Sequence, residues 1–338
     1  MIARLAPSMP ARKQQGFVLV LTLWVLVIVA IAAGYFAERV ARSVELAQPS
    51  KQNTRAMIDM AGMRAEILYR LGTTSMSFYG LGLGNTVIRF DNSPYRGLGN
   101  TLVQLQDNRG LLNLNQPDDD RLQRFLGLLG IAAEQRGHMI DTLRDFTDAD
   151  TLHRLNGAEN EEYLALNLPI PPNRNLITPW EARRIIGWGS VPQLWQTGRL
   201  VELTTTSLSG GLNPNTAPAE ILATLPGVTE EIAQAIIARR KLSPIIHDVQ
   251  LAEITSIPAK QFAEVIITFP GNSIRITQST RGLPWAVQYN ITLTPNSDKS
   301  PWRTDYYSRV STTPGDETQT NIPELPPRSI VPPENAPD

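Results

Sequence analysis

The sequence predicts an α+β protein in which a long N-terminal helix precedes an antiparallel sheet, with an all-α segment inserted into that sheet. Three observations predict this class. An unbroken apolar run follows a short basic segment, two-residue alternation is confined to residues 102–107 and 273–310, and short helical patterns fill the residues between them. The 338 residues are 19 % charged and 42 % hydrophobic, so we expect most of the chain to be globular.

A membrane anchor is predicted near the N-terminus. Residues 17–37 read FVLVLTLWVLVIVAIAAGYFA and carry no charge. As a helix they would span roughly 31 Å, about the thickness of a bilayer core. Arg12 and Lys13 precede the run. The positive-inside rule then places the short N-terminus in the cytoplasm and the rest of the chain across the membrane, so we predict a single pass.

Three interpretations of this segment remain open. It can be a plain transmembrane anchor, or a secretory signal that is cleaved near Ala30-Ile31-Ala32. The third interpretation uses Gly16-Phe17, because a polar, basic leader that ends in Gly before an apolar helix resembles the leader of pilins and pseudopilins. This resemblance implies that a prepilin peptidase cleaves after Gly16 and that Phe17 becomes N-methylated.

Leu21 departs from the usual pilin pattern. It occupies the fifth position of the mature chain, where pilins and major pseudopilins usually carry Glu. The resemblance implies that this Glu faces the terminal amine of a neighbouring subunit, because an unpaired carboxylate inside a membrane is costly. A subunit without it is consistent with a place at the end of a filament. The plain alternative is one more lipid-facing residue.

The first helix is expected to continue beyond the membrane. VARSVELA and MIDMAGMRAEILYRL place apolar residues at helical spacing. Pro49 lies between them and is predicted to kink or interrupt the helix. The apolar faces around Val40, Val44, Met57 and Met60 are predicted to contact partner subunits. The alternative is that these residues are buried against the chain's own sheet.

The rest of the chain divides by pattern. Residues 80–99 are rich in Gly and Asn and are predicted to be a loop, whereas LVQLQD (102–107), 273–278, 285–293 and 302–310 are predicted to be strands. The predicted organisation, in chain order, is a leader (1–16), the transmembrane part of the first helix (17–37), the first part of a sheet domain (38–111), an inserted α-helical domain (112–270), the second part of the sheet domain (271–312) and a Pro-rich disordered tail (313–338).

Two stretches of the helical segment look alike. They are GLLNLN at 110–115 and GLNPN at 211–215, and each leads into a helical pattern. Asn115 and Asn215 are predicted to cap helices, and Gly227 is predicted to form a turn between two of them. Short helical hairpins of this kind would make a small all-α domain.

The order and spacing of several short motifs resemble the general secretion pathway protein K family, the large minor pseudopilins of type II secretion systems. The motifs are LQDNRGLLNLN (105–115), DFTDAD (145–150), NGAENEEY (156–163) and LNPNTA (212–217), and the resemblance runs from Gly16 to about residue 310. It implies a pseudopilin α+β domain with a helical insertion. It also implies assembly with I-type and J-type minor pseudopilins at the pseudopilus tip, which would initiate or cap the pseudopilus and support export of folded proteins across the outer membrane. The expected location is the inner membrane, with the bulk of the chain in the periplasm.

A calcium site is predicted in the acidic stretch that follows residue 144. Hard oxygen ligands on a flexible loop are what Ca²⁺ prefers, and Gly157 permits a tight turn among them. The resemblance implies structural calcium here, although Thr151 and Phe146 depart from the usual family residues. The alternative is a solvated acidic loop. The candidate ligands are Asp145, Asp148, Asp150, Asn156, Glu159 and Glu162.

Several classes of function are disfavoured. The chain has no Cys and three His, and it has no nucleophile elbow, Walker loop or GxGxxG motif, so we predict that it is not an enzyme. LPGVTEEIAQAII (225–237) resembles a helix-hairpin-helix, but Thr229 replaces its second Gly, and Glu230 and Glu231 would repel phosphate. We therefore predict no nucleic-acid partner. The alternatives are a minor pilin of a type IV pilus and a membrane-anchored periplasmic adaptor or DNA-binding protein.

Overall fold

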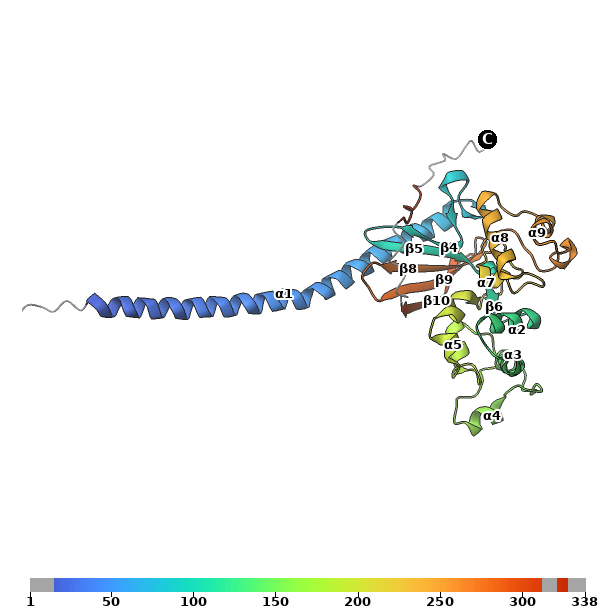
Figure 1. Ribbon diagram of the computed structural model, residues 1–338, viewed down its shortest axis with the longest axis horizontal. Coiled ribbons are helices and arrows are strands. Elements are labelled where there is room, and N and C mark those ends of the chain that lie inside the picture. The colour runs from blue at the N-terminus through green and yellow to red at the C-terminus, as the bar shows by residue number, and fades with distance from the viewer. Residues whose placement is uncertain (1–14, 312–320, 328–338) are drawn as a thin grey trace, which may run out of the picture. The chain divides into compact units, whose positions relative to one another are not determined.

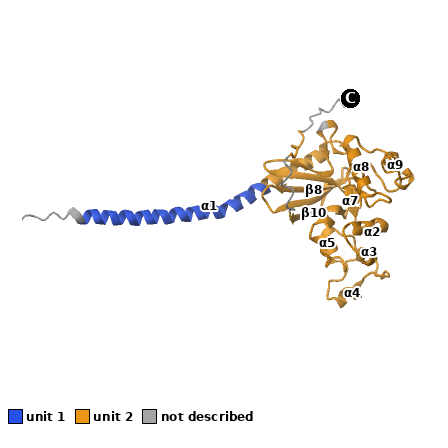
Figure 2. Cartoon of the chain, in the orientation of Figure 1, with its two compact units in different colours: residues 1–57 blue, residues 58–338 orange. Residues whose placement is uncertain are grey.

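The structure is a computed structural model that describes residues 15–311 and 321–327. It contains two compact units, residues 1–57 and residues 58–338 (Figure 2). Helix α1 (Gln15–Thr73) begins in the first unit and ends in the second. Of the predicted leader, residues 1–14 lie outside the described part of the chain.

The first unit, as far as it is described, is the N-terminal part of α1. Its apolar side chains are exposed, including Phe17 at 70 % and Trp24 at 64 %. Among the described residues, one helix is long and apolar enough to cross a membrane, with a mean hydropathy of 2.9 in its most apolar window. Of the prediction that Pro49 kinks or interrupts the helix, the interruption is wrong, because α1 is continuous there, and the kink stays a prediction. Pro49 has no N–H to donate to the carbonyl of Glu45, and the helix tolerates that loss.

A five-stranded antiparallel sheet forms the frame of the second unit, in the order β10-β9-β8-β5-β4 (Figure 1). The predicted strands are confirmed, and β9 has the bounds that its alternation indicated. The prediction that residues 80–99 form a loop, made from their Gly and Asn content, is wrong for β4 and for the short strands β2 and β3; β4 lacks alternation and contains Pro94, a residue confined to edges and bulges. The strands are β4 (Asp91–Arg96), β5 (Thr101–Asp107), β8 (Ser273–Thr280), β9 (Trp285–Leu293) and β10 (Trp302–Ser311). A small second sheet contains β1 (Met76–Ser77), β2 (Gly80–Leu81) and β3 (Ile88–Arg89).

The C-terminal part of α1 buries one side against this sheet. Met60, Met63, Ile67 and Leu71 share a core with the alternate residues of β5, β8 and β9. The prediction that Met60 contacts a partner is therefore wrong, because its side chain is 4 % exposed. Val40, Val44 and Met57 are more than half exposed, and their contact with partners stays a prediction.

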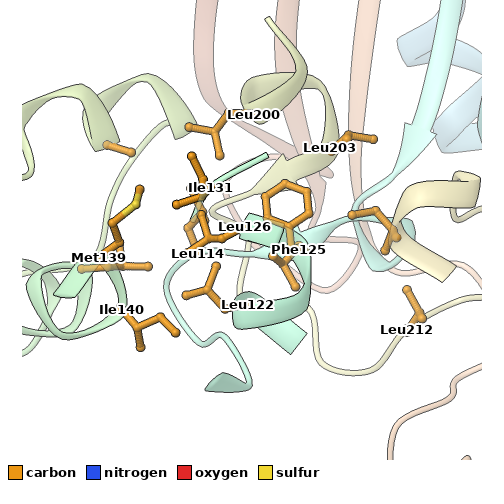
Figure 3. Packing of buried hydrophobic residues seen from close by; sticks show 14 of the residues in the cluster. Leu114, Leu122, Phe125, Leu126, Ile131, Met139, Ile140, Leu200, Leu203 and Leu212 are labelled. Carbon is orange, nitrogen blue, oxygen red and sulfur yellow. The ribbon is translucent and has the colours of Figure 1, made fainter. Parts of the chain in front are cut away.

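Helices fill the chain between β5 and β8, as predicted. Two of these helices have side-chain caps at their N-termini: Asp118 caps α2, and Thr229 caps α8, which begins with Glu230 and Glu231. The helices are α2 (Asp119–Leu128), α3 (Ala133–Thr147), α4 (Asn160–Ala165), α5 (Pro192–Trp195), α6 (Arg199–Leu203), α7 (Ala219–Leu222), α8 (Glu230–Leu242) and α9 (Asp248–Thr255), with a 3₁₀ turn at Pro179–Arg184. They enclose a second core, in which Phe125, Leu126 and Leu200 lie close together (Figure 3).

This helical block consists of two lobes that close in the same way. In the first lobe, β6 (Leu112–Asn113) pairs in parallel with β7 (Thr204–Thr205). In the second lobe, Leu212 makes a parallel bridge to Ile266. Each lobe therefore starts and ends at a short parallel bridge, and the two look-alike sequences open the two lobes.

Asn115 and Asn215 make equivalent hydrogen bonds in the two lobes. The prediction that they cap helices is wrong. Asn115 Nδ2 donates to the carbonyls of Leu176 and Thr206, at 2.9 and 2.8 Å, and its Oδ1 accepts from the Leu176 N–H. Asn215 Nδ2 donates to the carbonyls of Ile245 and Thr268, at 2.8 and 2.9 Å, and its Oδ1 accepts from the Ile245 N–H. Each buried amide therefore ties two distant loops of its lobe together.

The predicted domain boundaries lie close to the residues at which the helical core and the sheet core separate. The helical core runs from Leu112 to Phe262, and the sheet core resumes at Ile274. That 112–270 is a domain in its own right stays a prediction. The predicted disordered tail is wrong for residues 321–327, because Glu324 bridges in parallel to Arg96 and Ile322 is 9 % exposed. The rest of that tail, 313–320 and 328–338, lies outside the described residues.

Candidate functional site

The acidic stretch lies between α3 and α4, and the first of its carboxylates is buried. Asp145 is in the last turn of α3, and its side chain is fully buried. Glu159, just before α4, is 5 % exposed. Two carboxylates withdrawn from water are costly unless protein donors or a cation satisfy them.

Several buried oxygens of this cluster accept no hydrogen bond. Asp145 Oδ1, Asp148 Oδ1 and both carboxylate oxygens of Glu159 are buried without a hydrogen bond. Burial raises the pKa of Asp145, Asp148 and Glu159. The negative charges of Asp145, Asp148 and Asp150 raise the pKa of Glu159 further, so these four carboxylates lie close enough to repel one another.

The guanidinium of Arg154 partly balances the charge of the cluster. Arg154 Nε lies 3.3 Å from Asp145 Oδ1, and its Nη2 lies 3.9 Å from Asp148 Oδ2. The Arg154 side chain is 48 % exposed, and its backbone N–H donates to Asp145 Oδ2 at 3.2 Å. A half-exposed guanidinium is a weak counter-charge, so it leaves the buried oxygens under-satisfied.

The other two predicted ligands are engaged elsewhere. The backbone N–H and the Nδ2 of Asn156 both donate to Asp141 Oδ2 at 3.1 Å. Glu162 Oε2 accepts from the Glu159 N–H at 2.9 Å, which secures the start of α4, and its Oε1 lies 3.5 Å from His153 Nε2. The structure therefore brings Asp145, Asp148, Asp150 and Glu159 together, and it gives Asn156 and Glu162 structural partners.

The carboxylate oxygens of the cluster are the type of donor that a hard cation prefers, but they are not arranged around a single point. Among the described residues, no three His, Asp or Glu side chains already stand as a metal-binding group. Ca²⁺ takes six to eight oxygens and accepts backbone carbonyls, so a loop with orphaned carboxylate oxygens suits it chemically. Asp145, Asp148, Asp150 and Glu159 are the residues that would hold the ion.

Gly157 controls the position of Asp145. A Cβ built at Gly157 would overlap Asp145 Oδ2. We expect Gly157→Ala to displace that carboxylate, to weaken calcium binding by about tenfold and to destabilise the protein by roughly 1–3 kcal/mol. Gly137→Ala on α3 is the matched control, since its added Cβ meets nothing within 4 Å. Thermal melting with and without calcium checks both variants, and equal behaviour of the two would contradict this position for Gly157.

A second polar cluster joins the sheet to the helical block, and its centre is Asp107 at the end of β5. Asp107 Oδ1 accepts from the N–H groups of Arg109 and Gly271 at 3.0 and 3.1 Å. Its Oδ2 accepts from Asn213 Nδ2 and Thr216 Oγ1 at 2.9 and 3.0 Å. Burial raises the pKa of Asp107, and the four hydrogen bonds oppose that rise. The motifs at 105–115 and 212–217 therefore meet at one carboxylate. Their spacing indicated a family and gave no sign of this contact.

Two buried arginines reinforce the same junction. Arg275 on β8 donates to the carbonyls of Val201, Glu202 and Thr204 at the end of α6. Arg240 on α8 donates to the carbonyls of Pro214 and Ala217, within the 212–217 motif, and lies 3.9 Å from Asp91 on β4. Burial lowers the pKa of Arg240 to about 10, so it stays charged at neutral pH. Both lobes are thus fastened to the sheet.

The predicted helix-hairpin-helix lies in the second lobe. Gly227, at φ +74°, forms the turn between α7 and α8, as predicted. Thr229 Oγ1 accepts from the Ile232 N–H at the start of α8, and Val228, Ala233 and Ile236 are buried in the helical core. The hairpin is therefore a structural element of the lobe.

Comparison with known proteins gives two family matches and a structural likeness. Residues 100–193 match the family described as type II secretion system, protein K, and residues 209–266 match the helix-hairpin-helix motif. No curated protein matches the chain. Among solved structures, a chain in the crystal structure of the GspK–GspI–GspJ complex from the type 2 secretion system of enterotoxigenic Escherichia coli is similar in fold. The TM-score is 0.55 at 16 % identity, and the likeness covers 78 % of this chain and 99 % of that chain.

An exposed apolar N-terminal helix, an antiparallel sheet and an inserted helical block together form an α+β fold, which is similar to that of the solved GspK–GspI–GspJ chain. The family match falls on the first lobe and the strand before it, which contain the LQDNRGLLNLN, DFTDAD and NGAENEEY motifs. Over residues 100–193 the chain is therefore similar to the protein K family of type II secretion systems.

Proposed function

We propose that this chain is a minor pseudopilin that assembles with other minor pseudopilins at the tip of a type II secretion pseudopilus. The match of residues 100–193 to the protein K family carries this proposal. The similar structure is described as a complex of GspK with GspI and GspJ, so I-type and J-type subunits are the expected partners. Initiating or capping the pseudopilus would support export of folded proteins across the outer membrane.

The subunit acts by association and needs no catalytic centre. The apolar residues of α1 join the membrane-embedded bundle, in an inner membrane, and the remainder of the chain lies in the periplasm. The exposure of Phe17 to Phe36 supports a lipid or protein environment for that segment, because so large an apolar surface is not stable in water. Leu21 leaves the subunit without the carboxylate that would recruit a neighbour's terminal amine, which favours a terminal position.

We further propose that the acidic cluster holds a structural calcium ion. Four orphaned carboxylate oxygens on Asp145, Asp148 and Glu159 support this proposal. A divalent cation would remove the repulsion among the four carboxylates and would fix the loop between α3 and α4. The ion would then shape the surface that the first lobe offers to partners.

Processing at Gly16-Phe17 tests the pseudopilin assignment at its first step. We expect the chain expressed with a prepilin peptidase to lose residues 1–16 and to begin at N-methylated Phe17, as measured by intact mass and N-terminal sequencing. The matched variant is Gly16→Leu, which should stay intact in the same membranes. An unprocessed wild-type chain would indicate a plain anchor, and cleavage near Ala32 would indicate a secreted protein; either result contradicts the proposal.

A further inference from the structure

Residues 321–327, here called the strap, return from the C-terminal end of the chain to the outer side of β4. The strap runs parallel to β4, with Glu324 opposite Arg96. The Arg96 N–H donates to the Pro323 carbonyl at 2.8 Å, and the Leu325 N–H donates to the Arg96 carbonyl at 2.9 Å. The strap therefore occupies the edge that β4 would otherwise leave open.

Side chains of the strap fill a site made by β4 and α1. Ile322 is 9 % exposed, and Leu325 lies against the core between α1 and the sheet. Arg70, in the last turn of α1, donates to the Pro326 carbonyl at 2.7 Å while it pairs with Glu66. The site thus offers an apolar surface for Leu325, the backbone N–H and carbonyl of Arg96, and two cations, Arg70 and Arg96.

The strap is lightly attached to a sheet that does not depend on it. Its main-chain hydrogen bonds to the sheet involve one residue, Arg96, and its ion pair to Arg96 spans 3.5 Å with Glu324 70 % exposed. On its other side β4 pairs with β5 at Asp91 and from Pro94 to Arg96, independently of the strap. Ordering seven residues costs conformational entropy, so the strap should open more readily than the strand it covers.

We propose that β4 and the end of α1 form a binding site for a short extended peptide of the pattern apolar–Pro–acidic–apolar. This chain fills the site with its own residues 321–327, and a segment of the same pattern on another chain competes for it. The strap carries the ligand's features: Ile322 is buried, Leu325 packs against the core between α1 and the sheet, Glu324 pairs with Arg96, and the carbonyl of Pro326 accepts a hydrogen bond from Arg70. The site does not depend on the pseudopilin assignment.

Binding in trans tests the proposal. The probe is a labelled peptide with the sequence of residues 321–327, added to the detergent-solubilised full chain and to a chain that stops at Thr320. We expect the peptide to bind the shortened chain and to bind the full chain at least about tenfold more weakly, because the strap occupies the site there. A peptide with Ile322→Asp and Leu325→Asp is the control and should bind neither. No binding to the shortened chain, or equal binding to both chains, would overturn the proposal.

A full-length variant keeps the test valid if the shortened chain fails to fold. Leu325→Asp places a charge in the apolar surface, and Pro327→Asp places the same charge on an exposed residue of the strap. We expect the amide of Arg96 to exchange its hydrogen about tenfold faster in Leu325→Asp and at an unchanged rate in Pro327→Asp. The same exchange rate in both variants and in the wild type would overturn the proposal.

Discussion

Asp107→Ala should lower the melting temperature of the full chain by roughly 10 °C. The substitution leaves the N–H groups of Arg109 and Gly271, Asn213 Nδ2 and Thr216 Oγ1 without their acceptor in a site that water does not reach. Breaking a buried polar network by removing its charged partner costs roughly 3–5 kcal/mol. For a unit of this size, each kcal/mol shifts melting by about 2–4 °C.

Circular dichroism melting in detergent measures this effect, and Asp298→Ala is the matched control. Asp298 is an exposed carboxylate in the turn between β9 and β10, so its removal should change the melting temperature by no more than about 1–2 °C. If Asp107→Ala melted with the control, Asp107 would not hold the sheet and the helical block together.

Calcium should reverse the pH dependence that the acidic cluster imposes on stability. Folding raises the pKa of Asp145 and Asp148 above 3.8 and that of Glu159 above 4.5. An acid whose pKa is raised on folding stabilises the folded state while it is protonated. That stability is lost as the pH rises through the pKa that the acid has in the folded state. Without calcium, the cluster should therefore be most favourable below pH 4 and least favourable at neutral pH.

Bound calcium needs the ionised carboxylates, so its effect should be largest at neutral pH and should vanish in acid. At a free concentration one hundred times the dissociation constant, the ion should stabilise the protein by about 2.7 kcal/mol. Thermal melting at several pH values, with calcium and with a chelator, measures this difference.

Removing one charge from the cluster should stabilise the protein in the absence of calcium. Glu159→Gln removes a buried charge that repels three others, so the calcium-free variant should be more stable than the wild type at neutral pH and should lose most of its response to calcium. Glu161→Gln is the matched control, since it removes the same charge from an exposed residue of α4. A full calcium response in Glu159→Gln would show that the ion binds elsewhere.

Local patterns predicted much of this fold. Strand β9 was found because large apolar residues alternate with small or polar ones along it, although both of its faces are buried, and α1 was found because its apolar run has a helical length. Strand β4 was missed because it pairs through its backbone at an edge, with a side-chain order that carries no period. The strap was missed because a Pro-rich segment is stabilised here by an edge and a core from distant parts of the chain.

The acidic cluster, too, could be predicted only in part from local sequence. The acidic stretch and its glycine were visible in the sequence, but which carboxylates are buried depends on the last turn of α3 and on the start of α4. Asn156 and Glu162 were predicted as ligands from proximity in the sequence, whereas Asp141 and the Glu159 N–H engage them. The part played by Asp107 depends on contacts with residues more than one hundred positions away, which no local pattern reveals.

Complex formation with I-type and J-type subunits tests whether this chain is a minor pseudopilin. The full chain would be expressed together with the I-type and J-type minor pseudopilins of its own secretion system and a prepilin peptidase, extracted in detergent, and measured by native mass spectrometry. We expect a complex that contains one copy of this chain with both partners. A chain that is folded and processed, but remains free of both partners at micromolar concentration, would contradict it.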